Sequence, residues 1–171
     1  MGETVVYYGE MTSPVGPLTI LVSDNKAIRI DFGLMNDKKT QIVRWLKRYF
    51  ANPLLIEQKE KVDHIIQQID EYFAKTRQTF DFPYTFYGTS FQKQVWQALL
   101  DTTYGQVKTY KDIAKAIHHE KAVRAVGGAI GKNPLVIVVP CHRIIGSNGE
   151  LTGFGGGLAN KEILLKLEGC L

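Results

Sequence analysis

Cysteine is scarce in this chain: among its 171 residues only Cys141 and Cys170 occur. Two cysteines cannot form the disulfide framework of a small secreted protein, which favours a reducing compartment, and we expect the cytoplasm. Long apolar runs are also lacking, so no segment is expected to span a bilayer. The first residues, Met1 to Thr4, lack the basic and apolar regions of a secretory signal. The sequence therefore predicts a globular protein without a membrane partner.

A strong charge of either sign is absent too, because the net charge is only +4. Residues 1–88 contain eleven Lys/Arg and eleven Asp/Glu, whereas residues 89–171 contain ten and six, so the whole excess lies in the second half. Seven of those ten cations fall between Asp101 and Arg143. A basic region of this kind indicates a polyanionic partner. The alternative is an ordinary solvated face.

The first half has the pattern of a structural scaffold. Alternating apolar residues predict strands over 4–8, 18–22 and 26–32, which form an antiparallel meander. Apolar residues at helical spacing follow in two groups, with a chain break at Asn52-Pro53 between them, and residues 79–82 could add a strand. His64 is expected to face solvent. We predict a scaffold domain over residues 1–83 and a second, functional domain over 84–171.

The second half begins with three predicted helices. Thr89 to Gln92 and Thr109 to Asp112 have the pattern of capping boxes, each followed by an apolar helical stripe. A third helix over 122–132 consists largely of alanine and glycine, and Arg124 is the long side chain near its start. Two short helices in a basic region fit a helix-turn-helix, although the periodicity also fits any helical hairpin. The bare helix could pack against its neighbour or enter a nucleic-acid groove.

The segment Pro134 to Arg143 is the centre of the functional prediction. Its apolar, β-branched residues predict a buried strand that Pro140 ends, which would place Cys141 and His142 at the rim of the core. A thiol beside a titratable neighbour is typical of an activated nucleophile. The alternative is a small buried cysteine beside a surface histidine.

Two features near the end of the chain add to this prediction. The loop 153–157 has neither Walker nor dinucleotide spacing, so its glycines are expected to line a pocket at close range. A last helix over 158–168 precedes Gly169, and Glu168 lies beside its apolar stripe. A carboxylate there opposes the helix dipole and needs a partner, for which His142 is the candidate. The alternative is a frayed end with Glu168 in water.

The motif Asn133-Pro134, then Pro140-Cys141-His142-Arg143, then the glycine-rich loop resembles the active-site signature of the O6-alkylguanine-DNA alkyltransferases, also called methylated-DNA–protein-cysteine methyltransferases. The resemblance extends from about Ser90 to Gly169. It implies an α+β fold: a small N-terminal ribonuclease-H-like α/β domain with an antiparallel sheet, then a mainly helical domain with a helix-turn-helix, winged-helix-like. It also implies single-turnover transfer of an alkyl group from O6 of guanine, less readily O4 of thymine, to cysteine.

The resemblance also implies a role for each matching residue. Cys141 would accept the alkyl group, His142 would act as its base through a water, Glu168 would orient His142, and Asn133 would brace the turn. Tyr110 would help to turn the base out and hydrogen-bond the guanine ring. The implied DNA contacts are Arg124, which would fill the gap left by the flipped nucleotide, and Tyr110, Thr109, Ala122, Ala125, Gly127 and Lys132. The implied base pocket is Ile130, Ile144, Ser147, Phe154, Gly155 and Gly156.

Two departures from the family pattern change the expectations. Many relatives have Tyr at the position of Phe154 and Ser at Gly155, so a hydroxyl is lost from the pocket wall. Some relatives bind zinc in the N-terminal domain through cysteines and histidines, but no cysteine precedes Cys141 here, so we expect no metal and no cofactor. The expected partner is double-stranded DNA containing O6-alkylguanine, contacted in the minor groove without sequence preference by a monomer. A non-catalytic helix-turn-helix protein and a Cys-His-Glu thiol hydrolase are the alternatives.

Overall fold

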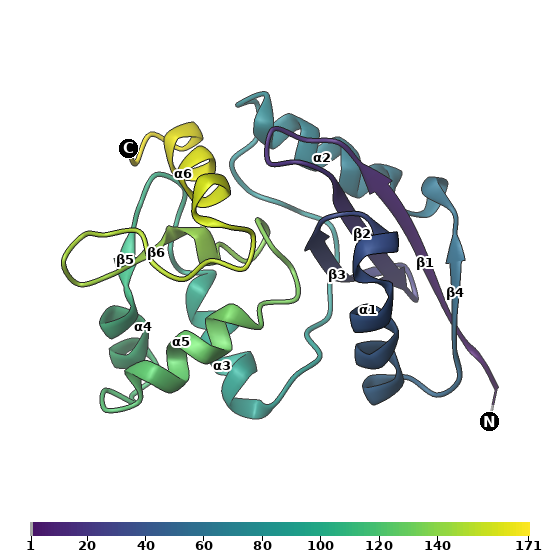
Figure 1. Cartoon of the computed structure of the whole chain (residues 1–171), viewed down its shortest axis with the longest axis horizontal. Coiled ribbons are helices and arrows are strands. Elements are labelled where there is room, and N and C mark those ends of the chain that lie inside the picture. The colour runs from purple at the N-terminus through teal and green to yellow at the C-terminus, as the bar shows by residue number, and fades with distance from the viewer. Residues whose placement is uncertain (1) are drawn as a thin grey trace. The chain divides into compact units, whose positions relative to one another are not determined.

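The computed structural model describes residues 2–171, which divide into two compact units (Figure 1). The N-terminal unit extends to Tyr87, and the C-terminal unit runs from Gly88 to Leu171. The sequence had suggested a division between residues 83 and 84. Eleven Lys/Arg and eleven Asp/Glu balance in the N-terminal unit, so the excess of ten over six belongs to the C-terminal unit. No helix within residues 2–171 has the length and apolar character needed to cross a membrane.

A four-stranded sheet of order β3-β2-β1-β4 organises the N-terminal unit. The strands are β1 (Thr4–Met11), β2 (Leu18–Ser23), β3 (Lys26–Phe32) and β4 (Pro53–Glu57). The predicted meander is confirmed, since β1 pairs antiparallel with β2 and β2 with β3. The expectation of a purely antiparallel sheet is wrong, because β4 pairs parallel with β1. Pro53, which we interpreted as a break, is the first residue of this edge strand, a position where proline is tolerated.

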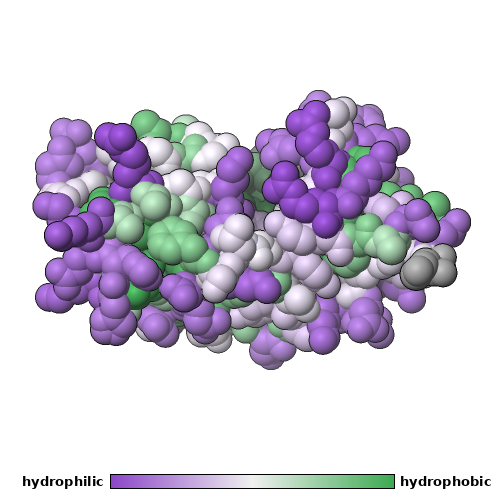
Figure 2. All heavy atoms as spheres, turned by 90° about the horizontal axis from the view of Figure 1, so that it is seen from below, coloured by the Kyte–Doolittle hydropathy of each residue, from purple (hydrophilic) through white to green (hydrophobic). Residues whose placement is uncertain are grey.

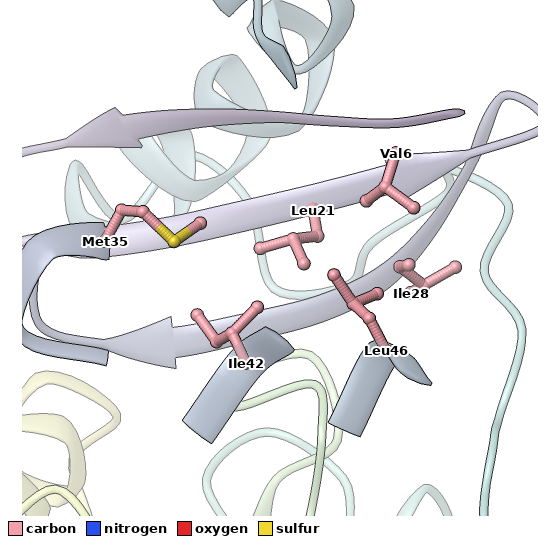
Figure 3. Packing of buried hydrophobic residues seen from close by; sticks show 6 residues of the cluster. All are labelled: Val6, Leu21, Ile28, Met35, Ile42 and Leu46. Atoms are coloured by element: carbon pink, nitrogen blue, oxygen red, sulfur yellow. The ribbon is translucent and has the colours of Figure 1, made fainter. Parts of the chain in front are cut away.

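Helices α1 (Met35–Tyr49) and α2 (Asp63–Phe73) complete this unit, with a short 3₁₀ turn, η1 (Lys59–Lys61), before α2. The side chain of Glu10 accepts a hydrogen bond of 2.7 Å from the first backbone amide of α1. The apolar stripe of α1 packs on the sheet, and Figure 3 shows this cluster. It consists of Val6, Leu21, Ile28, Met35, Ile42 and Leu46, all at most 3% exposed. Burial of each such side chain contributes about 1.5–3 kcal/mol.

The strand expected over residues 79–82 does not form. Instead Ala27 and Tyr84 make a single parallel bridge, in which Ala27 N–H donates to Pro83 O at 2.9 Å and Thr85 N–H to Ala27 O at 3.0 Å. Phe82 is nevertheless buried. The apolar character of this segment therefore reports burial and not strand pairing.

The C-terminal unit contains four helices and little sheet. Its elements are α3 (Ser90–Leu99), β5 (Lys108–Thr109), α4 (Tyr110–Ala116), α5 (Val123–Gly131), η2 (Cys141–Arg143), β6 (Ile144–Ile145) and α6 (Leu158–Leu167). Both predicted capping boxes are present: the Thr89 and Thr109 side chains each accept from the third helical amide at 3.1 Å. Trp96 of α3 donates its indole N–H to Ala129 O of α5 at 2.8 Å. This buried bond fixes α5 against α3.

The strand expected at residues 134–139 is wrong. The segment forms tight turns: Val138 N–H donates to Val136 O and Cys141 N–H to Val139 O, each at 2.8 Å. Ile137, between the first pair, has φ +72°, a strained value for a β-branched residue. The apolar run is buried, so hydrophobic burial stabilises a compact turn where periodicity had suggested an extended strand.

Candidate active site

Asn133 holds the turn that carries the thiol. Its side-chain amide donates to Val139 O at 2.8 Å, and its side-chain oxygen accepts from Leu135 N–H at 3.0 Å. One side chain thus bridges both ends of the turn and satisfies two backbone groups that its tight geometry leaves without ladder partners. The brace expected at Asn133 has a clear geometric basis.

Cys141, a free thiol, opens the 3₁₀ turn η2 and is only 6% exposed. Burial raises the pKa of the thiol above its ordinary value of 9.0, while the Asn133 side chain and the positive charge of Lys161 lower it. Burial dominates, so the resting sulfur is protonated at neutral pH. A thiol in this state needs a base when it reacts.

His142 is completely buried, and its Nε2 lies 2.7 Å from Glu168 Oε2, as the sequence predicted. An ionised carboxylate can only accept, so we assign the ring proton to Nε2. Nδ1, which is buried without a protein partner, then carries the lone pair. Burial lowers the pKa of His142 below 6.5, opposed by Glu168 and reinforced by Arg143 and Lys161. His142 is therefore a neutral imidazole with one basic nitrogen available.

Glu168 follows the last residue of α6, where the helix dipole disfavours a negative charge. The guanidinium of Arg143 resolves this conflict, because its Nε and Nη2 donate to the two carboxylate oxygens at 2.6 and 3.0 Å. Arg143 Nη1 also donates to Thr102 O at 2.6 Å, and the group lies 5.7 Å from the ring centroid of Tyr104. A paired, hydrogen-bonded charge of this kind is tolerated in the interior.

Sequence reasoning missed the structural role of Arg143, which we had counted among the cations of the basic region and as part of the motif, without a partner. It also missed Lys161, which is 1% exposed although it is charged. A signal for Lys161 was available: with Leu164, Leu165 and Glu168 it occupies positions i, i+3, i+4 and i+7 of α6, which is the buried face. Its Nζ donates to Ile144 O and, at 2.9 Å, to Thr152 O.

Tyr110, the first residue of α4, reaches the loop that follows β6. Its hydroxyl donates to Thr152 O at 3.2 Å. In the same loop the ring of Phe154 lies 5.8 Å from Lys161 Nζ. The structure therefore brings Tyr110, Phe154 and Lys161 together around one loop segment.

The remaining predicted residues divide by exposure. Of the expected base pocket, Ile130 and Ile144 are buried, Phe154 and Gly156 are half-buried, and Ser147 and Gly155 are exposed. Arg124 is exposed in the first turn of α5. Among the other expected DNA contacts, Thr109, Ala122 and Gly127 are half-buried, whereas Ala125 and Lys132 are exposed.

Helices α4 and α5 follow one another in the chain with a short connection between them. Residues 117–122 join them, and His118 adopts φ +60° in that turn. On the face of the C-terminal unit in Figure 2, apolar side chains gather in one area that hydrophilic side chains surround. Across residues 2–171, no group of three or more His, Cys, Asp or Glu side chains could hold a metal ion.

The arrangement can supply a buried sulfur nucleophile, a neutral base oriented by a carboxylate, and a hydroxyl donor from a neighbouring helix. The chain is also similar to known proteins in both of its units. Residues 90–170 match the family described as "6-O-methylguanine DNA methyltransferase, DNA binding domain", and residues 6–86 match its "ribonuclease-like domain".

Individual relatives agree. A protein of Bacillus subtilis named "Methylated-DNA--protein-cysteine methyltransferase, inducible" is 45% identical over 136 residues, covering 80% of this chain and 76% of the relative. A methylated-DNA–protein-cysteine methyltransferase of Methanosarcina acetivorans is 41% identical over 96% of this chain and 99% of its own length. The crystal structure of the Mycobacterium tuberculosis protein in complex with DNA gives a TM-score of 0.82 at 35% identity and covers 95% of this chain and 92% of that one.

Both family matches fall on successive parts of one chain, and the match to the Methanosarcina acetivorans relative covers 96% of it. The chain belongs to the 6-O-methylguanine DNA methyltransferase family.

Proposed function

We propose that this protein repairs DNA by direct reversal, moving a methyl or larger alkyl group from O6 of guanine, less readily from O4 of thymine, to the sulfur of Cys141. The observation that carries the proposal is the buried arrangement of Cys141 beside the His142–Glu168–Arg143 network. Family membership supports the activity. The assignment of each residue to a step is our own.

The chemical step is a displacement at saturated carbon. His142 Nδ1 takes the thiol proton through a bridging water, the sulfur attacks the alkyl carbon, and the bond between that carbon and O6 breaks. The electron pair of the broken bond goes to the guanine, which leaves as an anion. The Tyr110 hydroxyl stabilises that anion by donating to the ring, and the proton released from the thiol ultimately neutralises it. Glu168 remains ionised and keeps the proton of His142 on Nε2.

Turnover ends after one reaction. The product is a thioether, whose carbon–sulfur bond the His142 relay cannot hydrolyse because the relay only moves protons. A protonated resting thiol, favoured by burial, also protects the sulfur from oxidation before DNA binds. We therefore expect each molecule to repair one lesion.

DNA binding is assigned to the C-terminal unit, which we propose is a winged-helix-like module, and the N-terminal unit is proposed to be a ribonuclease-H-like scaffold. The target atom lies inside a duplex, so the nucleotide must leave the stack at a cost of a few kcal/mol. Arg124, exposed at the start of α5, would occupy the gap, and the small residues of α5 would let its backbone approach the minor groove. The base would be received by Ile130, Ile144, Ser147 and the 154–156 segment. We propose that the protein acts as a monomer in the cytoplasm, without metal or cofactor.

Neither alternative accounts for all of these observations. A thiol hydrolase of Cys-His-Glu type would use the same three side chains but has no need of a basic helix-turn-helix. A DNA-binding regulator would need side chains that read base edges, and α5 presents mainly alanine and glycine. Both lack the family evidence that supports alkyl transfer.

The deciding experiment is mass analysis after incubation with a duplex oligonucleotide that contains one O6-methylguanine. We expect the peptide carrying Cys141 to gain one methyl group while the peptide carrying Cys170 stays unchanged, so Cys170 serves as an internal control. Cys141→Ala should gain no methyl group yet still bind the duplex. A label on Cys170, or no label on either peptide, would overturn the proposal.

A further inference from the structure

Lys161 is a buried cation whose contacts explain how the interior accommodates it. Its ammonium group has three N–H bonds: two donate to the carbonyls of Ile144 and Thr152, and the charge also faces the ring of Phe154 at 5.8 Å. These two hydrogen bonds and the ring contact offset part of the desolvation of the charge. Lys161 therefore links the buried face of α6 to the carbonyls of Ile144 and Thr152.

Its two carbonyl partners lie on opposite sides of one hairpin-like turn. Gly146 N–H donates to Glu150 O at 2.9 Å, which closes the turn between Ile144 and Thr152. Bonds from a single ammonium to both sides hold the turn to α6, and Phe154 follows two residues after Thr152. Lys161 thus fixes the entry to the glycine-rich loop.

The carbonyl of Thr152 is shared by two donors. It accepts from Lys161 Nζ at 2.9 Å and from the Tyr110 hydroxyl at 3.2 Å. A carbonyl oxygen has two lone pairs and can serve both. In this structure, then, the hydroxyl of Tyr110 is engaged by the protein itself. It must leave Thr152 before it can donate to a guanine ring.

We propose that Lys161 is a positioning residue that holds the Thr152 carbonyl and thereby frees Tyr110 for the alkyl-transfer step. This inference rests on the proposed function of Tyr110. With Lys161 present, departure of the hydroxyl leaves the carbonyl still hydrogen-bonded. Without Lys161, the same departure removes the last protein donor to the Thr152 carbonyl. Tyr110 is then held in place, because its release costs free energy during the reaction.

The test is a double-mutant cycle between Lys161→Met and Tyr110→Phe, read as single-turnover methyl transfer from an O6-methylguanine duplex. The dissociation constant and the limiting rate are measured separately from the dependence on protein concentration. In the unaltered chain, Tyr110→Phe should lower the limiting rate about tenfold or more, the size expected for loss of a positioned proton donor. In the Lys161→Met background, Tyr110→Phe should change it by less than about threefold, because the two effects couple.

A purely structural role for Lys161 would make the two losses multiply, and that result would overturn the inference. Lys161→Met should also act on the limiting rate and change the dissociation constant by less than about threefold, since Lys161 is buried and presents almost no surface to a ligand. Lys166→Met is the matched control: Lys166 lies on the same helix but is exposed and pairs with Glu162, so its cycle with Tyr110→Phe should show no coupling.

Folding is checked by thermal unfolding of each variant. If Lys161→Met is unfolded at the assay temperature, Lys161→Gln replaces it. This variant retains one donor group, so the effect of Tyr110→Phe on the limiting rate should lie between its effects in the unaltered chain and in Lys161→Met. An effect as large as in the unaltered chain would also overturn the inference. Failure of the proposed function gives a different result, because the unaltered chain would then transfer no methyl group to Cys141.

Discussion

Glu168 shows at the scale of one residue how the site resolves competing demands. Its carboxylate accepts from Arg143 at 2.6 and 3.0 Å and from His142 at 2.7 Å, and it is 5% exposed. The arginine pairs with the carboxylate charge, and a carboxylate that only accepts hydrogen bonds selects the His142 tautomer with its proton on Nε2. In the proposed mechanism the same carboxylate therefore contributes to both stability and chemistry.

Glu168→Gln should damage both properties. The change leaves Arg143 as an uncompensated buried charge, so we expect a loss of about 3–5 kcal/mol in the free energy of unfolding. The amide can also present its NH₂ group to His142, which disturbs the tautomer, so methyl transfer should slow by about 10²-fold or more in molecules that remain folded.

Glu162→Gln provides the control for Glu168→Gln. Glu162 is on the same helix and pairs with Lys166 at 3.0 Å in solvent, so its replacement should change stability by less than about 1 kcal/mol. Urea unfolding and single-turnover transfer measure the two effects. Equal behaviour of the two variants would contradict the role given to Glu168.

The lowered pKa of His142 predicts acid sensitivity of the fold. The folded state disfavours the imidazolium, so the unfolded chain binds more protons once the pH falls below the ordinary value of 6.5. The stabilising contribution of neutral His142 is thus fully present above pH 6.5 and is lost as the pH falls toward the folded-state pKa. The thermal unfolding temperature should decline as the pH is lowered from about 7.5 to 5. His142→Asn should make this decline shallower.

His64→Asn is the comparison for that measurement, since His64 is exposed on α2. Its replacement should leave the decline unchanged. An identical acid response in the His142→Asn and wild-type chains would show that His142 does not titrate in the way we infer.

At the scale of the element, local signals predicted those helices whose ends carry their own hydrogen bonds. The Thr89 and Thr109 boxes gave the starts of α3 and α4, and Gly169, with φ +80°, follows the end of α6. The pairing of Glu168 with His142 was also predictable, because a carboxylate beside an apolar stripe needs a partner.

The segments that were predicted wrongly depend on contacts distant in sequence or on turn geometry. Periodicity cannot show that Asn133 closes a turn across Val139, so 134–139 looked like a strand. The parallel pairing of β4 with β1 and the hydrogen bond of Lys161 to the loop after β6 require the tertiary fold, although the spacing of Lys161 on α6 did indicate its burial. Arg143 was missed because an arginine next to a basic region gives no sign that it is buried.

The two capping boxes allow a matched test of α4. Thr89→Ala and Thr109→Ala each remove one side-chain acceptor from a helix start, and each should cost about 1 kcal/mol of stability. Only Thr109→Ala loosens the turn that carries Tyr110, so only this variant should also slow methyl transfer on duplex DNA. Chemical unfolding checks the first expectation and single-turnover kinetics the second. Equal transfer rates for both variants would show that the start of α4 does not affect methyl transfer.

At the scale of the whole molecule, DNA binding and chemistry are assigned to the same unit but to different residues of it. The chemistry rests on buried groups, whereas Arg124 and Lys132 are exposed on or just after α5. Substitution of an exposed cation should therefore change DNA engagement without changing the reactivity of the thiol.

Arg124→Ala should slow repair of duplex DNA by about tenfold or more, since the unstacked nucleotide loses the side chain that replaces it. Reaction with a free O6-alkylguanine base, which needs no base flipping, should change by less than about twofold. Arg48→Ala, at an exposed position of α1, is the control and should affect neither reaction. Equal losses in duplex and free base would contradict the intercalating role.

The unequal distribution of charge has a consequence before any contact with DNA. Because the positive excess belongs entirely to residues 88–171, the field of a polyanion exerts a torque on the chain as well as a pull. Within about 10 Å, the screening distance at 0.1 M salt, that torque favours approach with the helical unit leading. The chain is then already oriented when it meets DNA. Lowering the salt concentration should therefore raise the fraction of collisions that lead to binding, and not merely the number of collisions.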